Sequence, residues 1–104
     1  MNYRAIEDFV GETPLVRLQR IPGADNSRRN NVILAKLEGN NPAGSVKDRP
    51  ALQMMRDAIA DGRLTRDKIL IDSTSGNTGV AYSLFGAALG HRVRLVMPSN
   101  VSKA

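Results

Sequence analysis

Two short polar loops contain the residue types that could do chemistry in this chain. The first, residues 38–47, ends in Lys47 and is followed by an amphipathic run. The second, residues 73–79, gathers hydroxyl and amide side chains around two glycines. A lysine that loses its proton can attack a carbonyl and form a Schiff base, and a glycine-rich loop ahead of a helix can bind a carboxylate or phosphate.

Lys47 is expected at the N-terminus of a helix, because Ser45 and Asp48 have the spacing of a capping box. The ammonium would then face the positive end of the helix dipole, which disfavours the charged form of the amine. A solvated lysine at a frayed helix start fits the same residues. The physics of this loop alone therefore leaves both interpretations open.

The second loop is expected to lead into another helix, whose free backbone N–H groups and nearby hydroxyls could hold an anion. An ordinary N-cap cluster is the alternative, since Ser and Thr favour that position anyway. The loop has neither the Walker A pattern nor the Gly-x-Gly-x-x-Gly pattern of dinucleotide-binding proteins. Glu38 stands at the start of the first loop and Asp72 just before the second, and we assign neither of them, nor His91, to the site.

The elements that must position these loops alternate between strand and helix. Apolar runs predict buried strands at 32–37, 68–73 and 91–97, and apolar spacing of three and four residues predicts helices that follow Ser45 and span 80–90. Ahead of them we expect a short helix at 3–9, a strand at 13–21 and a loop at 22–31. This order favours an α/β fold, a three-layer arrangement with a parallel sheet, whose strand ends carry both loops.

Composition narrows the class of protein. The 104 residues suit one small domain, and the absence of cysteine excludes disulfides and thiolate metal sites, so we predict no metal. No apolar run approaches the roughly 18 residues that span a bilayer, and no signal-peptide pattern is present, so we expect a cytoplasmic protein without a membrane partner. The net charge of +5 comes from scattered residues and favours a solvated surface over a nucleic-acid partner.

Taken together, the two loops resemble the cysteine synthase family, pyridoxal-phosphate enzymes of fold type II. The stretches EGNNPAGSVKDRPAL (38–52) and STSGNTGVA (73–81) carry the resemblance, and ETPLVRLQR (12–20) and VRLVMPSNVS (93–102) are also similar, in the same order. The residues ahead of the lysine are more similar to B-type O-acetylserine sulfhydrylases than to A-type members. The resemblance covers nearly the whole chain and implies part of a fold type II domain.

The resemblance also implies a role for each site residue. Lys47 would form a Schiff base with pyridoxal 5′-phosphate and then act as general base, and Asn77 would bond the 3′-oxygen of the cofactor ring. The residues implied to hold the carboxylate of the substrate are Thr74, Ser75, Gly76, Asn77 and Thr78. The implied reaction replaces the acetate or phosphate of an activated serine by sulfide or thiosulfate, with the cofactor as electron sink.

Length is the main departure from the family. The resemblance implies a protein about three times as long as this chain. The phosphate-binding Gly-Thr-Gly-Gly-Thr loop of the family has no counterpart in this chain. We therefore expect an N-terminal segment whose C-terminal remainder is absent, with a strand and loop region at 1–35 and part of the small α/β domain at 36–104. Alone it should bind the cofactor weakly and not turn over, whereas the full-length enzyme would be a homodimer.

Three alternatives remain beside a cysteine synthase. A cystathionine β-synthase has similar loops, and a serine/threonine dehydratase is a further fold type II lyase, although Val46 and Thr78 argue against it. A small basic binding module is the alternative outside enzymes, and its affinity for DNA should fall steeply with salt. Glu12 also stands where the family usually has asparagine, so we assign it no site role.

Overall fold

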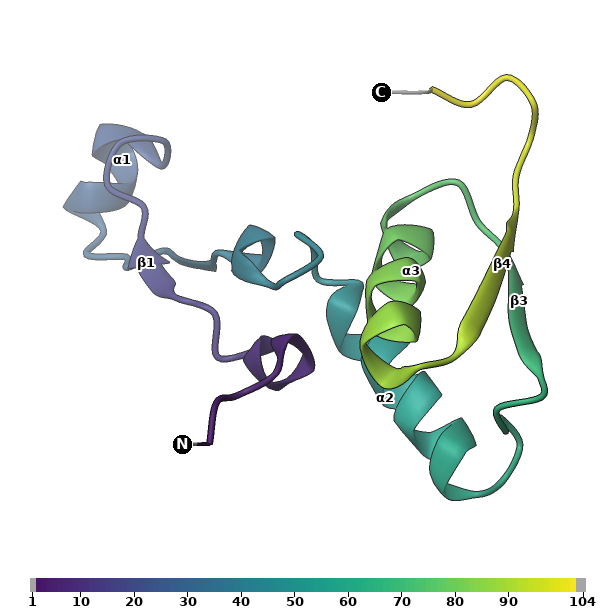
Figure 1. The fold of residues 1–104 in the computed structure, drawn as a ribbon. Helices are drawn as coiled ribbons and strands as arrows, with labels where there is room; N and C mark the ends of the chain where they lie inside the picture. The colour runs from purple at the N-terminus through teal and green to yellow at the C-terminus, as the bar shows by residue number, and fades with distance from the viewer. Residues whose placement is uncertain (1, 103–104) are drawn as a thin grey trace.

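The computed structural model describes residues 2–102 and divides into a body and a projecting arm (Figure 1). Its elements, in chain order, are η1 (Ile6–Phe9), β1 (Leu15–Arg17), α1 (Gly23–Arg28), β2 (Leu34–Lys36), η2 (Glu38–Asn40), α2 (Asp48–Ala60), β3 (Ile69–Ser73), α3 (Asn77–Leu89) and β4 (Arg92–Val96). Among the described residues, no helix is both long enough and apolar enough to cross a membrane.

The body is built on a parallel pair of strands, which confirms the predicted α/β class. Strands β3 and β4 pair in register from Ile69 opposite Arg92 to Ser73 opposite Val96. Burial alternates along both strands: Leu70 and Val93 pack against the core, while Ile71 and Val96 are exposed. The described residues therefore form a sheet layer with helices on one face, which is two of the three predicted layers.

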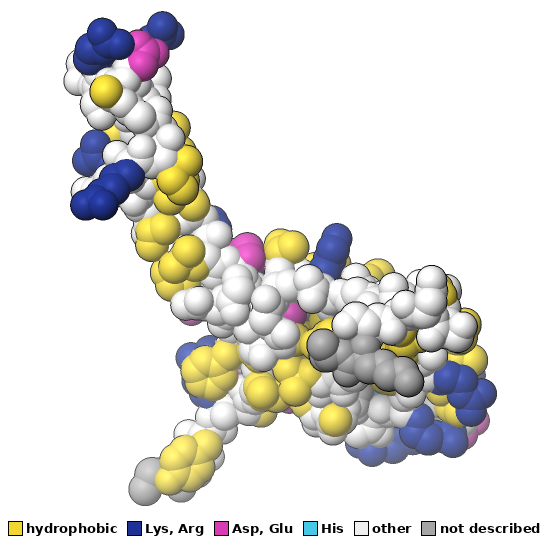
Figure 2. Space-filling model, turned by 90° about the horizontal axis from the view of Figure 1, so that it is seen from above, with side chains coloured by type: hydrophobic (Ala, Val, Ile, Leu, Met, Phe, Trp, Pro, Cys, Tyr) yellow, Lys and Arg dark blue, Asp and Glu magenta, His cyan; other side chains and the backbone are white. Residues whose placement is uncertain are grey.

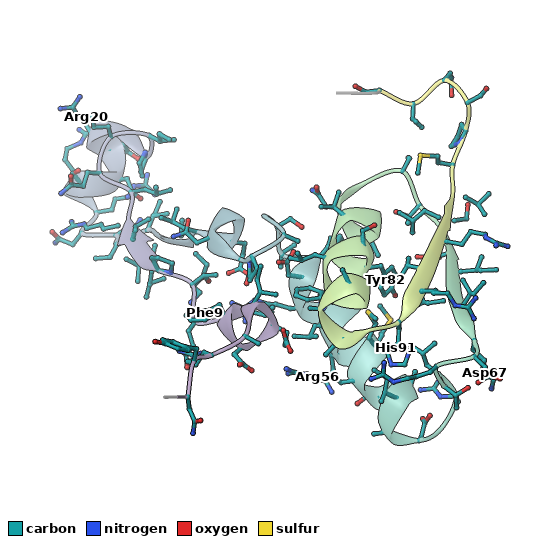
Figure 3. The ribbon with its side chains drawn as sticks, viewed as in Figure 1. Phe9, Arg20, Arg56, Asp67, Tyr82 and His91 are labelled. Carbon is teal, nitrogen blue, oxygen red and sulfur yellow. The ribbon has the colours of Figure 1, made fainter. Side chains whose placement is uncertain are left out.

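Helices α2 and α3 form the core of the body. The apolar stripe predicted on α2 is buried against α3, and these side chains make up the core: Ala51, Leu52, Met55, Leu64, Ala81, Tyr82 and Phe85. Figure 3 shows Tyr82 on α3, on the side of the helix toward the sheet, and its hydroxyl donates to the sulfur of Met54 at 3.7 Å. Helix α3 therefore packs against both α2 and the sheet.

The strand predicted at 32–37 is the main error of the sequence-based fold. It is shortened to β2, and it pairs with β1 in an antiparallel ribbon, with Leu15 opposite Lys36 and Arg17 opposite Leu34. The side chains of Val32 and Leu34 are exposed, so the strand is not buried as the apolar run predicted. The parallel sheet of the described residues consequently has two strands, β3 and β4.

The segment 22–31 also differs from the predicted loop. It contains the short helix α1, which begins at Gly23, where φ is 79°. Asn30 ends this region with φ of 57°, a left-handed conformation that asparagine tolerates better than most residues. Turn-forming composition therefore described the ends of the segment correctly and missed the turns of helix between them.

The arm, residues 14–37, makes the molecule elongated. The Cα radius of gyration of the whole molecule is 18.1 Å, whereas a compact domain of this length has a radius of gyration of about 13 Å. Figure 2 shows hydrophobic side chains along one edge of the arm and Lys and Arg side chains along the other edge and the tip. Figure 3 places Arg20 at this tip, at the opposite end of the molecule from Asp67.

Candidate functional site

Lys47 lies at the N-terminus of α2, as predicted, and its side chain is exposed. It is the N-cap residue, and its carbonyl accepts the backbone N–H of Ala51 at 3.1 Å. The predicted capping box is wrong, because Ser45 Oγ accepts the Lys47 N–H at 3.1 Å and Asp48 Oδ2 accepts the Ala43 N–H at 2.6 Å. These polar side chains therefore fix the loop that leads to Lys47 and do not cap the helix behind it.

The first turn of α2 explains why the helix begins at this point. Pro50 is the third residue of the helix, where its missing N–H removes no helical hydrogen bond. Asp48 is fully buried at the first position, where an acidic side chain suits the positive end of the helix dipole. This turn fixes the backbone of Lys47, while the side chain of Lys47 extends into solvent.

The second predicted loop lies at the carboxyl end of β3, and α3 starts earlier than predicted. The helix begins at Asn77, not at residue 80, so Asn77 and Thr78 belong to its first turn. The N-cap residue is Gly76 in an extended conformation, and no side chain caps the helix. The ordinary N-cap interpretation is therefore wrong, and the first N–H groups of α3 lack helical partners.

The surroundings of this loop leave room for a ligand. A side chain at Gly76 would meet no atom within 4 Å, so the backbone at the start of α3 can be approached closely. Ser75, Gly76 and Asn77 are exposed, while Thr74 and Thr78 are half-buried. Amide and hydroxyl donors beside a helix N-terminus match the chemistry of a carboxylate.

Lys47 and the second loop lie at the starts of two helices that pack together, but within residues 2–102 they do not contact each other through a hydrogen bond. Helices α2 and α3 pack against each other, and in Figure 1 both begin at their upper ends. No hydrogen bond of the described residues links Lys47 to residues 74–78. Two cavities lie beside η1 and α2, and their walls include Gly11, Thr13 and Arg49. Neither Lys47 nor the loop 74–78 lines either cavity.

Sequence reasoning missed three polar residues next to the Lys47 loop. Glu38 binds Arg49 through two contacts, from Nε to Oε1 at 2.6 Å and from Nη2 to Oε2 at 3.1 Å. The hydrogen bond from Arg49, followed by that from Thr13, lowers the pKa of Glu38 to about 2. Asn41 is buried beside them. Their positions were the available signal in the sequence, since Glu38 begins the loop and Arg49 lies two residues after Lys47.

The donor groups of the two loops fit the predicted cofactor. An exposed amine at Lys47 can bind an aldehyde covalently, and the amide of Asn77 can donate to a ring oxygen. Residues 2–102 contain no cluster of three or more His, Cys, Asp or Glu side chains arranged for a metal ion. Fold and site together define an α/β domain whose exposed amine and amide are compatible with an aldehyde cofactor.

Comparison with known proteins identifies the family. Residues 6–104 match the family described as pyridoxal-phosphate dependent enzyme. The chain therefore belongs to the pyridoxal-phosphate dependent enzymes, which confirms pyridoxal 5′-phosphate as the family cofactor and fold type II as the wider fold.

Curated relatives point to one branch of this family. Cysteine synthase B of Pseudomonas syringae pv. syringae is 52% identical over 102 residues, which are 98% of this chain and 58% of the relative. Cysteine synthase B of Pseudomonas aeruginosa is 52% identical over 100 residues, 96% of this chain and 32% of the relative. The chain thus spans between about one third and three fifths of these relatives.

A solved structure shows the same fold. Cysteine synthase of Entamoeba histolytica superposes with a TM-score of 0.92 at 43% sequence identity, over 99% of this chain and 30% of that chain. The predicted resemblance to the cysteine synthases is therefore confirmed for the described fold.

Proposed function

We propose that this chain forms the part of a cysteine synthase that holds the reactive end of pyridoxal 5′-phosphate and the carboxylate of the substrate. The observation that carries the proposal is the placement of Lys47 and of the loop 74–78 at the N-termini of two helices that pack together. The proposed reaction replaces the acetate or phosphate of an activated serine by sulfide or thiosulfate. Its product is cysteine or S-sulfocysteine.

Lys47 has two proposed tasks. Its amine holds the cofactor, and once the substrate has displaced it, the free amine takes the proton from the α-carbon of the substrate. The bound cofactor supplies an electron sink for the charge left at that carbon. An exposed side chain on a fixed backbone suits both tasks, because the amine can move between two partners while its starting point stays constant.

The start of α3 has the proposed task of holding the substrate. The N–H groups of Asn77 and Thr78, which begin α3, and the hydroxyls of Thr74, Ser75 and Thr78 donate to the carboxylate. Gly76 lets the carboxylate approach the backbone, since no atom occupies the space where a side chain would stand. Asn77 donates to the 3′-oxygen of the cofactor ring. These donors hold the amino acid while Lys47 acts on its α-carbon.

Trapping of the cofactor tests this proposal without requiring turnover. The chain is incubated with pyridoxal 5′-phosphate, reduced with borohydride and digested, and the modified lysines are located by mass spectrometry. The lysine nitrogen replaces the aldehyde oxygen, which leaves as water, and borohydride supplies the hydride that makes the new carbon–nitrogen bond permanent. We expect modification of Lys47 ahead of Lys36 and Lys68, and its loss in Lys47→Arg.

The control for this experiment is Lys68→Arg, which removes an exposed lysine just before β3, at the other end of this strand from the loop 74–78. It should leave modification of Lys47 unchanged. Labelling that is equal at Lys47 and Lys68 in the wild-type chain would contradict the proposal. The homodimer, the cytoplasmic location and the division into residues 1–35 and 36–104 stay predictions for the whole enzyme.

A further inference from the structure

The buried polar groups of this chain gather around one loop. Among residues 2–102 the buried polar or charged side chains are Thr13, Asn41 and Asp48, and each bonds within or onto the segment that carries Lys47. Burial of polar groups lowers stability unless every group is paired. A concentration of them beside one exposed lysine therefore calls for a reason beyond core packing.

Asn41 joins both ends of its own loop to the N-terminal segment. Its Oδ1 accepts the backbone N–H of Gly11 at 2.8 Å, and its Nδ2 donates to the carbonyls of Glu38 at 2.8 Å and Ser45 at 3.1 Å. A third contact, to Glu38 Oε1 at 3.2 Å, uses the same amide. The side chain is 3% exposed, so water does not compete for these bonds. Asn41 thus fixes both ends of the loop and ties it to the N-terminal segment.

The ion pair of Glu38 and Arg49 closes the loop from the other side. Glu38 is the first residue of the loop and Arg49 lies two residues after Lys47, so their two-point contact connects the two ends of the loop. Thr13 donates to Glu38 Oε2 and accepts from Arg49 Nη2 at 3.2 Å. A side chain at Gly11 would stand 3.1 Å from Arg49 Nη1, so the N-terminal segment packs directly on this pair.

We propose that Asn41, Glu38 and Arg49 are positioning residues that fix the direction in which Lys47 leaves the body. The inference rests on the function proposed for Lys47. Hydrogen bonds set distances and angles that apolar packing leaves adjustable, and catalysis depends strongly on placement of the reacting atoms. The network holds the backbone on both sides of Lys47 and leaves its amine unbound, which suits a lysine that must exchange partners.

The test measures where pyridoxal 5′-phosphate is trapped in the intact chain. The quantity is the ratio of adduct at Lys47 to adduct at Lys68, with folding checked by circular dichroism. We expect Asn41→Ala to lower this ratio at least about fivefold, because misplacement of a reacting group reduces its rate steeply. Glu38→Gln, which keeps the side-chain shape and removes the charge, should lower the ratio in the same direction.

Two controls separate positioning from general loss of structure. Asn40→Ala removes a neighbouring amide that makes no side-chain hydrogen bond in the structure, and Leu89→Ala weakens the core at the far end of α3. Both should leave the ratio within about twofold of wild type. An equal fall in Leu89→Ala would overturn the inference, as would an unchanged ratio in folded Asn41→Ala and Glu38→Gln. If the wild-type chain shows no preference for Lys47 over Lys68, that result contradicts the proposed function itself, and the inference that rests on it is contradicted too.

Discussion

At the scale of single residues, the ion pair between Glu38 and Arg49 shows how a partly exposed ion pair can still have a fixed geometry. An isolated surface ion pair contributes little, because water screens it and two long side chains lose freedom. Here Thr13 bonds to both partners, and Asn41 bonds to the carboxylate. The planar guanidinium matches the carboxylate in two places, which gives direction as well as attraction.

The lowered pKa of Glu38 predicts how stability depends on pH. Because the folded state holds the ionised form, with pKa about 2 against the ordinary 4.5, the pair stabilises the protein above pH 4.5. That contribution should be lost as the pH falls from about 4.5 toward 2. Urea unfolding of wild type and Glu38→Gln at several pH values measures it. The difference in the free energy of unfolding should be largest near neutral pH and disappear at the acid end.

The control for this pH series is Asn40→Ala, which removes no charge. Its difference from wild type should not change with pH. A stability difference for Glu38→Gln that is as large at pH 2 as at pH 7 would show that charge is not the source of the effect.

At the scale of elements, α3 depends on a close approach to β4. Glycine weakens a helix, so a helical glycine needs a packing reason. At Gly86 a side chain would stand 2.4 Å from Val93 Cγ2 and 3.0 Å from the His91 carbonyl oxygen. The helix then ends at Gly90, whose φ of 78° is left-handed, as expected for a helix-terminating glycine.

This approach predicts that Gly86→Ala destabilises the body. The added methyl must displace Val93 or push the helix from the sheet, and overpacking of this kind costs about 1–3 kcal/mol. Equilibrium unfolding in urea gives the change in free energy. In the double variant Gly86→Ala with Val93→Ala, the overlap with valine is removed, so the combined cost should be smaller than the sum of the two single costs.

The matched control is Ala87→Ser, an exposed substitution one residue further along α3. It should change the free energy of unfolding by less than about 0.5 kcal/mol. A Gly86→Ala protein as stable as wild type, or a fully additive double variant, would rule out the close contact as the reason for glycine at this position.

At the scale of the whole molecule, the arm is a two-stranded ribbon that carries apolar side chains on its surface. Leu15, Val32 and Leu34 are exposed, and the ribbon extends away from the core (Figure 2). An isolated two-stranded ribbon is marginally stable, and exposed apolar surface with free strand edges favours association. Thr13 directly precedes the arm and donates to Glu38, which directly follows it, so this hydrogen bond closes the base of the arm.

We therefore predict that the 104-residue chain associates with itself in solution. Sedimentation velocity at increasing concentration should show an apparent mass that rises with concentration. Leu34→Lys removes an exposed apolar side chain from β2 and adds a charge, so it should shift the distribution toward the monomer. Asn31→Lys adds the same charge to the arm without removing apolar surface, and should associate like wild type. A wild-type chain that is monomeric throughout would contradict the prediction.

The sequence by itself determined the local part of this protein. The periodicity of α2 and α3, the apolar runs of β3 and β4, and the place of Lys47 at a helix start follow from side chains close together in the chain. Only the tertiary structure decided which strands pair and which distant residues share a hydrogen bond. The apolar run before Glu38 fits any sheet, and its pairing with β1 depends on distant contacts. The bond from Gly11 to Asn41 joins residues 30 positions apart, and local patterns contain no record of such a bond.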